Sequence, residues 1–196
     1  MSSFSLFLLA LTITWPPELI LPLTGIKGEH NSEIARYIQR VSSVFTSIDV
    51  FSDSDRSCRL QQSDDITSEW ICPGVGGYKL KIIDSDNRMD ASVMDPRGKE
   101  HPLNFQDAIT RSFSSLGQKA DWRVVRKNGA LVPIALIIRV NESGFEGRRT
   151  ASYLSVSKIG GSEICVTDRI APTVDQYKRA LRAADVAINR PCRASE

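Results

Sequence analysis

Alternation of apolar and polar side chains with a period of two dominates the chain from Phe45 to Arg169. The segment YKLKII places Tyr78, Leu80 and Ile82 on one face and two lysines on the other. The segments SEWIC, RMDASVM and DWRVVRK alternate in the same way, and the turn-forming stretches DSDN and DPRGKEHP lie between such segments. This pattern is typical of strands with one buried and one solvated face. It predicts an antiparallel sheet of about six or seven strands.

Two hairpins are predicted within this sheet. Asn128 and Gly129 follow DWRVVRK and precede a long apolar segment, and both residue types tolerate the positive φ of a type I′ turn. The second arm is apolar on both faces from Ile134 to Ile138, which favours a central position. A further hairpin is expected between TASYLSVSKI and SEICVTDRI, with Gly160 and Gly161 at the turn.

The pattern changes to a helical period in TVDQYKRALRAADVAIN near the C-terminus. Thr173 is the expected cap, and the apolar stripe consists of Val174, Tyr177, Leu181, Ala184 and Ile188. We therefore expect an α+β domain in which a C-terminal helix packs on one face of the antiparallel sheet.

Two other segments are less regular. NSEIARYIQRVSSVF has Ile34, Ile38, Val41 and Phe45 at helical spacing, which fits either a short helix or a loosely held arm. Residues 99–119 have the composition of a long connection with one helical turn, where an irregular functional loop is expected.

The N-terminus contains an uncharged apolar run from Phe4 to Trp15. It is shorter than the roughly 20 residues that a bilayer span requires, and it fits the central region of a secretory signal. We expect residues 1–25 to be a signal peptide or an uncleaved membrane anchor and residues 26–44 a linker or short helix. Residues 45–196 then form one domain, and the protein is periplasmic or secreted.

Composition and charge narrow the class of partner. The chain has 41% hydrophobic and 24% charged residues and a formal net charge of +2, which is ordinary for a globular protein. This balance excludes the clustered basic face of a nucleic-acid binder, and we interpret the basic residues as solvated charges: Arg123, Arg126, Lys127, Arg148 and Arg149. The expected partner is a protein or an envelope component, with membrane contact only through the N-terminal segment.

Four cysteines, Cys58, Cys72, Cys165 and Cys192, support the same compartment. None stands in a C-x-x-C pair, so no zinc site is expected. An even number of cysteines behind a signal-like leader favours disulfides. Three pairings are possible, and we favour the two local ones, Cys58–Cys72 and Cys165–Cys192.

The stretch CPGVGGYKLKI poses a choice between a phosphate-binding loop and a chain corner. A phosphate loop leads into a helix, whereas here the glycines lead into a predicted strand. We interpret Pro73, Gly74, Gly76 and Gly77 as a structural turn beside Cys72, with no cofactor.

The motifs CPGVGGYKLKI, RMDASV, SFSSLGQKADWRV and PIALIIRV together resemble a family of small exported proteobacterial proteins of unknown function. The resemblance covers residues 45–192. The chain departs from the family at Ser114, where asparagine is usual, and at Asp121, where glutamate is usual. The resemblance implies export and disulfides, and it assigns no catalytic residues.

Candidate catalytic groups are few. A hydrolase would need His101 together with a serine and an aspartate, yet the chain has no G-x-S-x-G motif. Asp84, Asp86 and Asp90 resemble the start of a calcium loop, but Arg88 and Met89 occupy positions that a ligand and a glycine require, so no metal is expected.

The sequence therefore predicts an exported non-enzymatic protein with a binding or envelope-associated role. Two alternatives remain: a small hydrolase that uses the His101 loop, and an inhibitor or binding module for a secreted enzyme that acts through a protruding loop.

Overall fold

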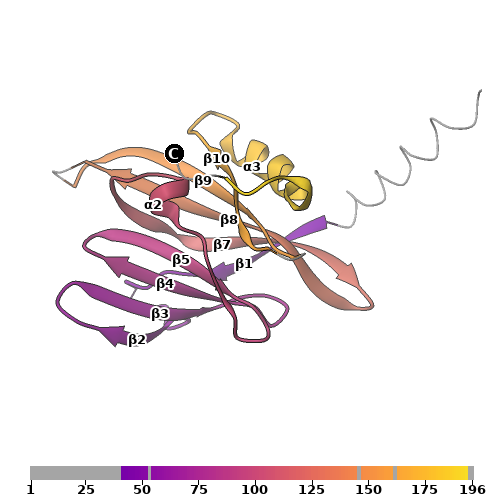
Figure 1. Cartoon of the computed structure of the whole chain (residues 1–196), viewed down its shortest axis with the longest axis horizontal. Coiled ribbons are helices and arrows are strands. Elements are labelled where there is room, and N and C mark those ends of the chain that lie inside the picture. Colours follow the sequence, from indigo (N-terminus) through magenta and orange to yellow (C-terminus); the bar gives the residue numbers. More distant parts are fainter. Residues whose placement is uncertain (1–40, 53, 145–146, 161–162, 194–196) are drawn as a thin grey trace, which may run out of the picture. The chain divides into compact units, whose positions relative to one another are not determined.

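The computed structural model describes residues 41–52, 54–144, 147–160 and 163–193 (Figure 1). The predicted leader, residues 1–25, and residues 26–40 of the expected linker lie outside this part of the chain. The strands are β1 Val41–Ser47, β2 Arg59–Ser63, β3 Thr67–Pro73, β4 Lys79–Ser85, β5 Arg88–Met94, β6 Glu100–Pro102, β7 Phe113–Lys127, β8 Ala130–Ser143, β9 Arg149–Lys158 and β10 Cys165–Ile170. The helices are α2 Phe105–Ala108, α3 Gln176–Asp185 and the 3-10 turn η1 Ala187–Asn189.

The prediction of six or seven antiparallel strands is wrong. The described residues form one ten-stranded sheet in the order β10-β9-β8-β7-β5-β4-β3-β2, with β1 added to β7 and β6 added to β5. The sheet is mixed, because β5 and β7 run parallel where Arg88 pairs with Ser114, while the other pairs are antiparallel. The architecture is mainly β, with a single helix longer than four residues in the described part of the chain.

Strand β7 is the branch point of this sheet. Its beginning contacts β5, and its second half, residues 119–125, pairs with β1, while β8 pairs with it on the other side. The register between β7 and β8 shifts between Leu116 and Ala120, where the neighbour of β7 changes from β5 to β1. The two halves of the sheet, β2–β6 and β7–β10 with β1, therefore meet at a short parallel seam.

One hydrophobic core is shared by the two halves. It contains Leu80 and Ile82 from β4, Trp122 from β7 and Leu136 from β8, all with no exposed surface. The indole Nε1 of Trp122 donates a hydrogen bond to Thr46 Oγ1 of β1 at 2.9 Å. This bond satisfies the polar atom of a buried ring and holds β1 against β7.

Helix α3 packs against β8, β9 and β10, on the face of the sheet opposite to the shared core (Figure 1). Its buried residues are Gln176, Ala180, Ala183 and Ala184, so the predicted stripe is rotated: Val174 is fully exposed, and Tyr177 and Ile188 are about 40% exposed (42% and 41%). Alanines lie against the sheet because their small side chains let the helix axis approach it closely. The Gln176 amide donates to the carbonyl oxygens of Ser152 at 2.7 Å and Ile170 at 2.9 Å.

Local predictions had mixed outcomes. The hairpin between β7 and β8 is confirmed, with φ of 51° at Asn128 and 81° at Gly129. Neither alternative for residues 31–45, a short helix or a loosely held arm, fits from Val41 onward, because Val41–Ser47 forms β1; the earlier residues lie outside the described chain. The helical turn expected within residues 99–119 is present as α2, but the segment is not a long irregular loop, since it also contains β6 and the start of β7.

Candidate functional site: a pocket at the seam between β5 and β7

The parallel seam between β5 and β7 is held by a small set of polar contacts. The Ser114 backbone N–H donates to the carbonyl oxygen of Asn87 at 3.0 Å, and the Ser114 hydroxyl lies 3.4 Å from the carbonyl oxygen of Met89. One residue pair, Arg88 and Ser114, is in register here. Because the two strands diverge on either side of so short a contact, a cavity opens at this end of the shared core.

This cavity has a volume of about 430 Å³, which is within the range of small-molecule sites. The hydrophobic part of its lining comes from two aromatic rings and a thioether, and the polar part comes mainly from hydroxyl and amide groups. The lining residues are Phe51, Asp84, Asn87, Met89, Phe113, Ser114, Ser115, Ser143, Gly144 and Gly147. We call this cavity the seam pocket.

The two aromatic walls are fixed by neighbouring side chains. The guanidinium of Arg88 lies 4.6 Å from the centre of the Phe113 ring, and Phe51 packs edge-on against Trp70 with ring centres 5.9 Å apart. Such contacts restrict the rotamers of both rings. Phe51 nevertheless remains 67% exposed, so its ring forms an accessible rim.

Asp84 is the one charged residue in the described lining of the seam pocket. It continues the inward row of β4, in which Leu80 and Ile82 are fully buried, because residues two apart in a strand share a face. Its Oδ1 is buried and has no hydrogen-bond partner. Burial, and to a smaller extent the charge of Asp86, raise the pKa of Asp84 above its usual value.

Sequence reasoning missed this site because Asp84 was assigned to the turn segment DSDN. The period-two pattern of YKLKII, continued by two residues, places Asp84 on the same face as Leu80 and Ile82. This continuation of the pattern was the sequence signal for an inward-facing Asp84. The contact between β5 and β7 had no sequence signal, since it joins residues that are far apart along the chain.

The three aspartates that resemble the start of a calcium loop, Asp84, Asp86 and Asp90, do not converge. Asp84 pairs across the hairpin with Met89, and Asp90 pairs with Ile83, so Asp84 and Asp90 lie on opposite faces of the sheet. Asp90 instead accepts the backbone N–H of Phe105 at 3.0 Å and thereby fixes the start of α2. Asp86 pairs with Arg88 in the turn.

His101 lies in a second hollow of about 330 Å³. Its Nε2 is 3.5 Å from Asp95 Oδ2, and Tyr78 and Glu163 also line the hollow. Burial alone would raise the pKa of Asp95, but hydrogen bonds from the Lys99 and Arg97 backbone outweigh it and lower that pKa. The described lining supplies a histidine and an aspartate but no serine, threonine or cysteine beside them.

The glycine-rich stretch forms a corner between β3 and β4, as predicted for its glycines, whereas Pro73 is the last residue of β3 and pairs with Lys79. Gly76 and Gly77 adopt φ of 64° and 85°, and the chain enters strand β4 at Lys79. Gly74 is required for a second reason, because a Cβ there would lie 2.4 Å from the Tyr78 carbonyl oxygen. Since no helix follows the glycines, they do not form a phosphate-binding loop.

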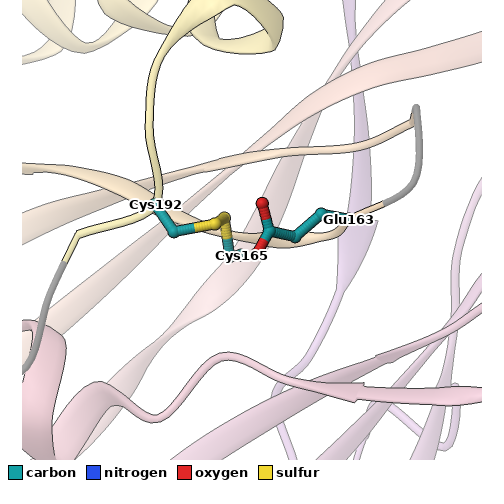
Figure 2. A group of neighbouring side chains, drawn as sticks. All are labelled: Glu163, Cys165 and Cys192. Atoms are coloured by element: carbon teal, nitrogen blue, oxygen red, sulfur yellow. A yellow bond between two sulfur atoms is a disulfide. The ribbon is translucent and has the colours of Figure 1, made fainter.

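The disulfides join Cys58 to Cys72 and Cys165 to Cys192, the two local pairs favoured from the sequence. Figure 2 shows Glu163 beside the second bond, with its carboxylate near the two sulfur atoms. These sulfurs are bonded to each other and so are not thiolate ligands, while the Glu163 carboxylate lies 3.1 Å from Lys158 Nζ. Two disulfides indicate an oxidising location outside the cytosol.

The basic residues do not gather in one patch. Arg123 is buried and forms an ion pair with Asp185 at 2.8 Å. Arg126 and Lys127 lie near one end of β8, whereas Arg148 and Arg149 lie near the other end of that 14-residue strand. A strand of this length spans about 45 Å, which separates the two pairs.

Comparisons with known proteins give no assignment for this chain. No family model, no curated protein and no solved structure matches it. The resemblance to small exported proteobacterial proteins therefore stays a prediction. Among the helices of the described residues, none has the length and hydrophobicity needed to cross a bilayer.

Proposed function

We propose that this chain is an exported, periplasmic binding protein without enzymatic activity, and that it holds a small organic ligand in the seam pocket. The observation that carries the proposal is the carboxylate of Asp84, the one charged group in the described lining of the seam pocket, whose Oδ1 is buried without a hydrogen-bond partner. A buried carboxylate oxygen without a hydrogen bond costs stability. Such a cost is expected at functional sites, where a charged side chain is kept in place for a ligand.

The experiment compares intact masses of the exported protein under native and denaturing conditions. The full chain is produced with export to an oxidising compartment, and we expect a non-covalently bound small molecule that is lost on denaturation. The variant Ser143→Phe places a ring in the pocket wall and should lose the bound mass. The matched control Ser63→Phe, on the fully exposed strand β2, should retain it.

The proposal fails if the wild type carries no added mass and if no compound in a chemically diverse set raises the Tm of the wild type more than that of Ser143→Phe. An envelope protein rather than a small molecule would appear in the same experiment as a stoichiometric complex that survives in Ser143→Phe.

A second candidate function is hydrolysis at His101, which the Asp95–His101 pair in its hollow favours. This candidate predicts turnover of small activated esters, with loss of at least about 100-fold in His101→Ala, because general-base catalysis typically contributes that much. Equal hydrolysis by the wild type and His101→Ala removes the candidate. The inhibitor alternative needs a loop clear of the sheet, whereas residues 99–119 are folded into β6, α2 and β7.

A further inference from the structure

The position of Asp84 is unusual for a structural carboxylate. On its two neighbouring strands it lies opposite Ser68 and Met89, so neither neighbour in the sheet offers a positive charge. Its Oδ1 is shielded from solvent, and no side chain or backbone N–H in the described structure reaches it. A stabilising surface carboxylate would instead be solvated or paired.

The two cations nearest to Asp84 in sequence are used elsewhere, and the closer one, Lys81, forms ion pairs with Glu69 and Glu100. Arg88 binds Asp86 across the β4–β5 turn and also stacks over Phe113. These two contacts fix its guanidinium on the Phe113 ring and on the turn. The charge of Asp84 is therefore not neutralised within its own hairpin, and the nearby Asp86 adds to the negative potential.

The walls of the seam pocket complement a cation with a hydrocarbon body. Phe51 presents an exposed aromatic ring, whose face attracts cations, while Phe113 and Met89 present hydrocarbon and a polarisable thioether. No lysine or arginine is among the described lining residues, so an anionic ligand would meet the Asp84 carboxylate without compensation.

From this geometry we propose that the seam pocket binds a small organic ammonium ion, with the ammonium group paired with the Asp84 carboxylate and the hydrocarbon body against Phe51, Met89 and Phe113. The inference rests on the proposed function and names the chemical class of its ligand. The hydroxyl groups of Ser115 and Ser143 and the amide of Asn87 line the same cavity and can accept the remaining ammonium protons.

The test measures binding of matched probes to the full chain by titration calorimetry at pH 7 and low salt. The probes are 2-phenylethylammonium, which is protonated at this pH, the neutral 2-phenylethanol and the anionic 3-phenylpropanoate. We expect the ammonium probe to bind at least about tenfold more tightly than the alcohol, because its hydrogen bond to a carboxylate is charge-assisted. The anion should bind more weakly than the alcohol.

Two isosteric variants assign that preference to Asp84. Asp84→Asn removes the buried charge and should abolish the preference for the ammonium probe, while binding of the alcohol stays within about twofold. Asp65→Asn removes the same charge from the exposed turn between β2 and β3, away from the seam pocket, and it should keep the preference. Thermal unfolding of both variants verifies that they are folded.

Each other outcome overturns the inference. Equal binding of the ammonium and alcohol probes shows a pocket without cation selectivity, which leaves the proposed binding function intact. An unchanged preference in Asp84→Asn places the cation elsewhere. The organic ammonium class is rejected if calcium chloride alone gives the Asp84-dependent heat, or if no probe binds at millimolar concentration. In either case, the native mass measurement still tests the proposed binding function separately.

Discussion

At the scale of single residues, Asp84 opposes the stability of the fold that contains it. The side chain stands at the end of the apolar row of Leu80 and Ile82 and has one oxygen without a partner. Sites that bind ligands are commonly destabilised in this way, since the groups that await the ligand are unsatisfied without it. Removing the charge should therefore help the empty protein.

We predict that Asp84→Asn raises the free energy of unfolding at pH 7 by less than about 1 kcal/mol, because Asp84 is only partly buried and solvent screens its charge. The folded-state pKa of Asp84 is raised, so ionisation favours the unfolded state as pH rises above the pKa of about 3.9 in an unfolded chain. The difference between variant and wild type should be small near pH 3 and should grow toward pH 7. Urea unfolding at both pH values measures it, and an equal difference at both contradicts the assignment.

Gly74 shows a different constraint at the same scale. A methyl group there would lie 2.4 Å from the Tyr78 carbonyl oxygen and 2.9 Å from the Trp122 ring, both in well-packed surroundings. We expect Gly74→Ala to destabilise by about 3 kcal/mol through overpacking. Gly77→Ala should cost about 1 kcal/mol, because it meets only left-handed backbone strain. Chemical unfolding gives both values, and the reverse ranking would show that the corner relaxes.

At the scale of secondary structure, α3 is attached to the sheet by charge as well as by alanine packing. Arg123 of β7 donates to Asp185 of α3 and to Ser43 of β1, each at 2.8 Å. Tyr177 of α3 donates to Asp121 at 2.7 Å. Asp121 and Arg123, which flank the buried Trp122, thus hold the helix while Trp122 fills the core.

We predict that Asp185→Asn destabilises the protein by about 3 kcal/mol, because the largely buried Arg123 loses its counter-charge. The control Asp175→Asn, at the other end of α3, removes an exposed 3.6 Å pair with Arg182 and should cost about 0.5 kcal/mol or less. Thermal unfolding of both variants tests the contrast. Equal, small effects would mean that alanine packing alone holds the helix.

Local patterns predicted the long strands and failed for the short ones. Segments such as YKLKII and RMDASVM alternate because each has one face in the shared core. By contrast, β2 is exposed along its whole length and β6 has three residues, so neither carries a periodic signal. β1 appeared helical because its apolar spacing coincided with the helical period, whereas pairing with the distant residues 119–125 makes it a strand.

The candidate site was less predictable than the strands. Asp84 is visible as a continuation of an apolar row, but its significance depends on the seam between Arg88 and Ser114. That contact joins two strands separated by β6 and α2 and has no local sequence signature. A hydrogen-bond partner that is missing from a buried oxygen is a property of the folded chain alone.

At the scale of the whole molecule, two covalent links close loops of different size. Cys58–Cys72 spans 14 residues and Cys165–Cys192 spans 27. Loop-closure entropy predicts that replacing the first pair by serine costs about 3 kcal/mol and the second about 3.5 kcal/mol. Unfolding of the two double-serine variants, with and without reductant, measures these costs; a wild type unaffected by reductant would contradict the expected contribution.

The second link also governs how the protein responds to cleavage. Residues 171–175 between β10 and α3 are exposed, and Val174 is fully so, yet they lie inside the ring that Cys165–Cys192 closes. A protease that nicks this stretch would leave both fragments attached to each other. The nicked molecule would migrate as an intact chain on a non-reducing gel and would separate into two fragments once a thiol reagent opens the ring.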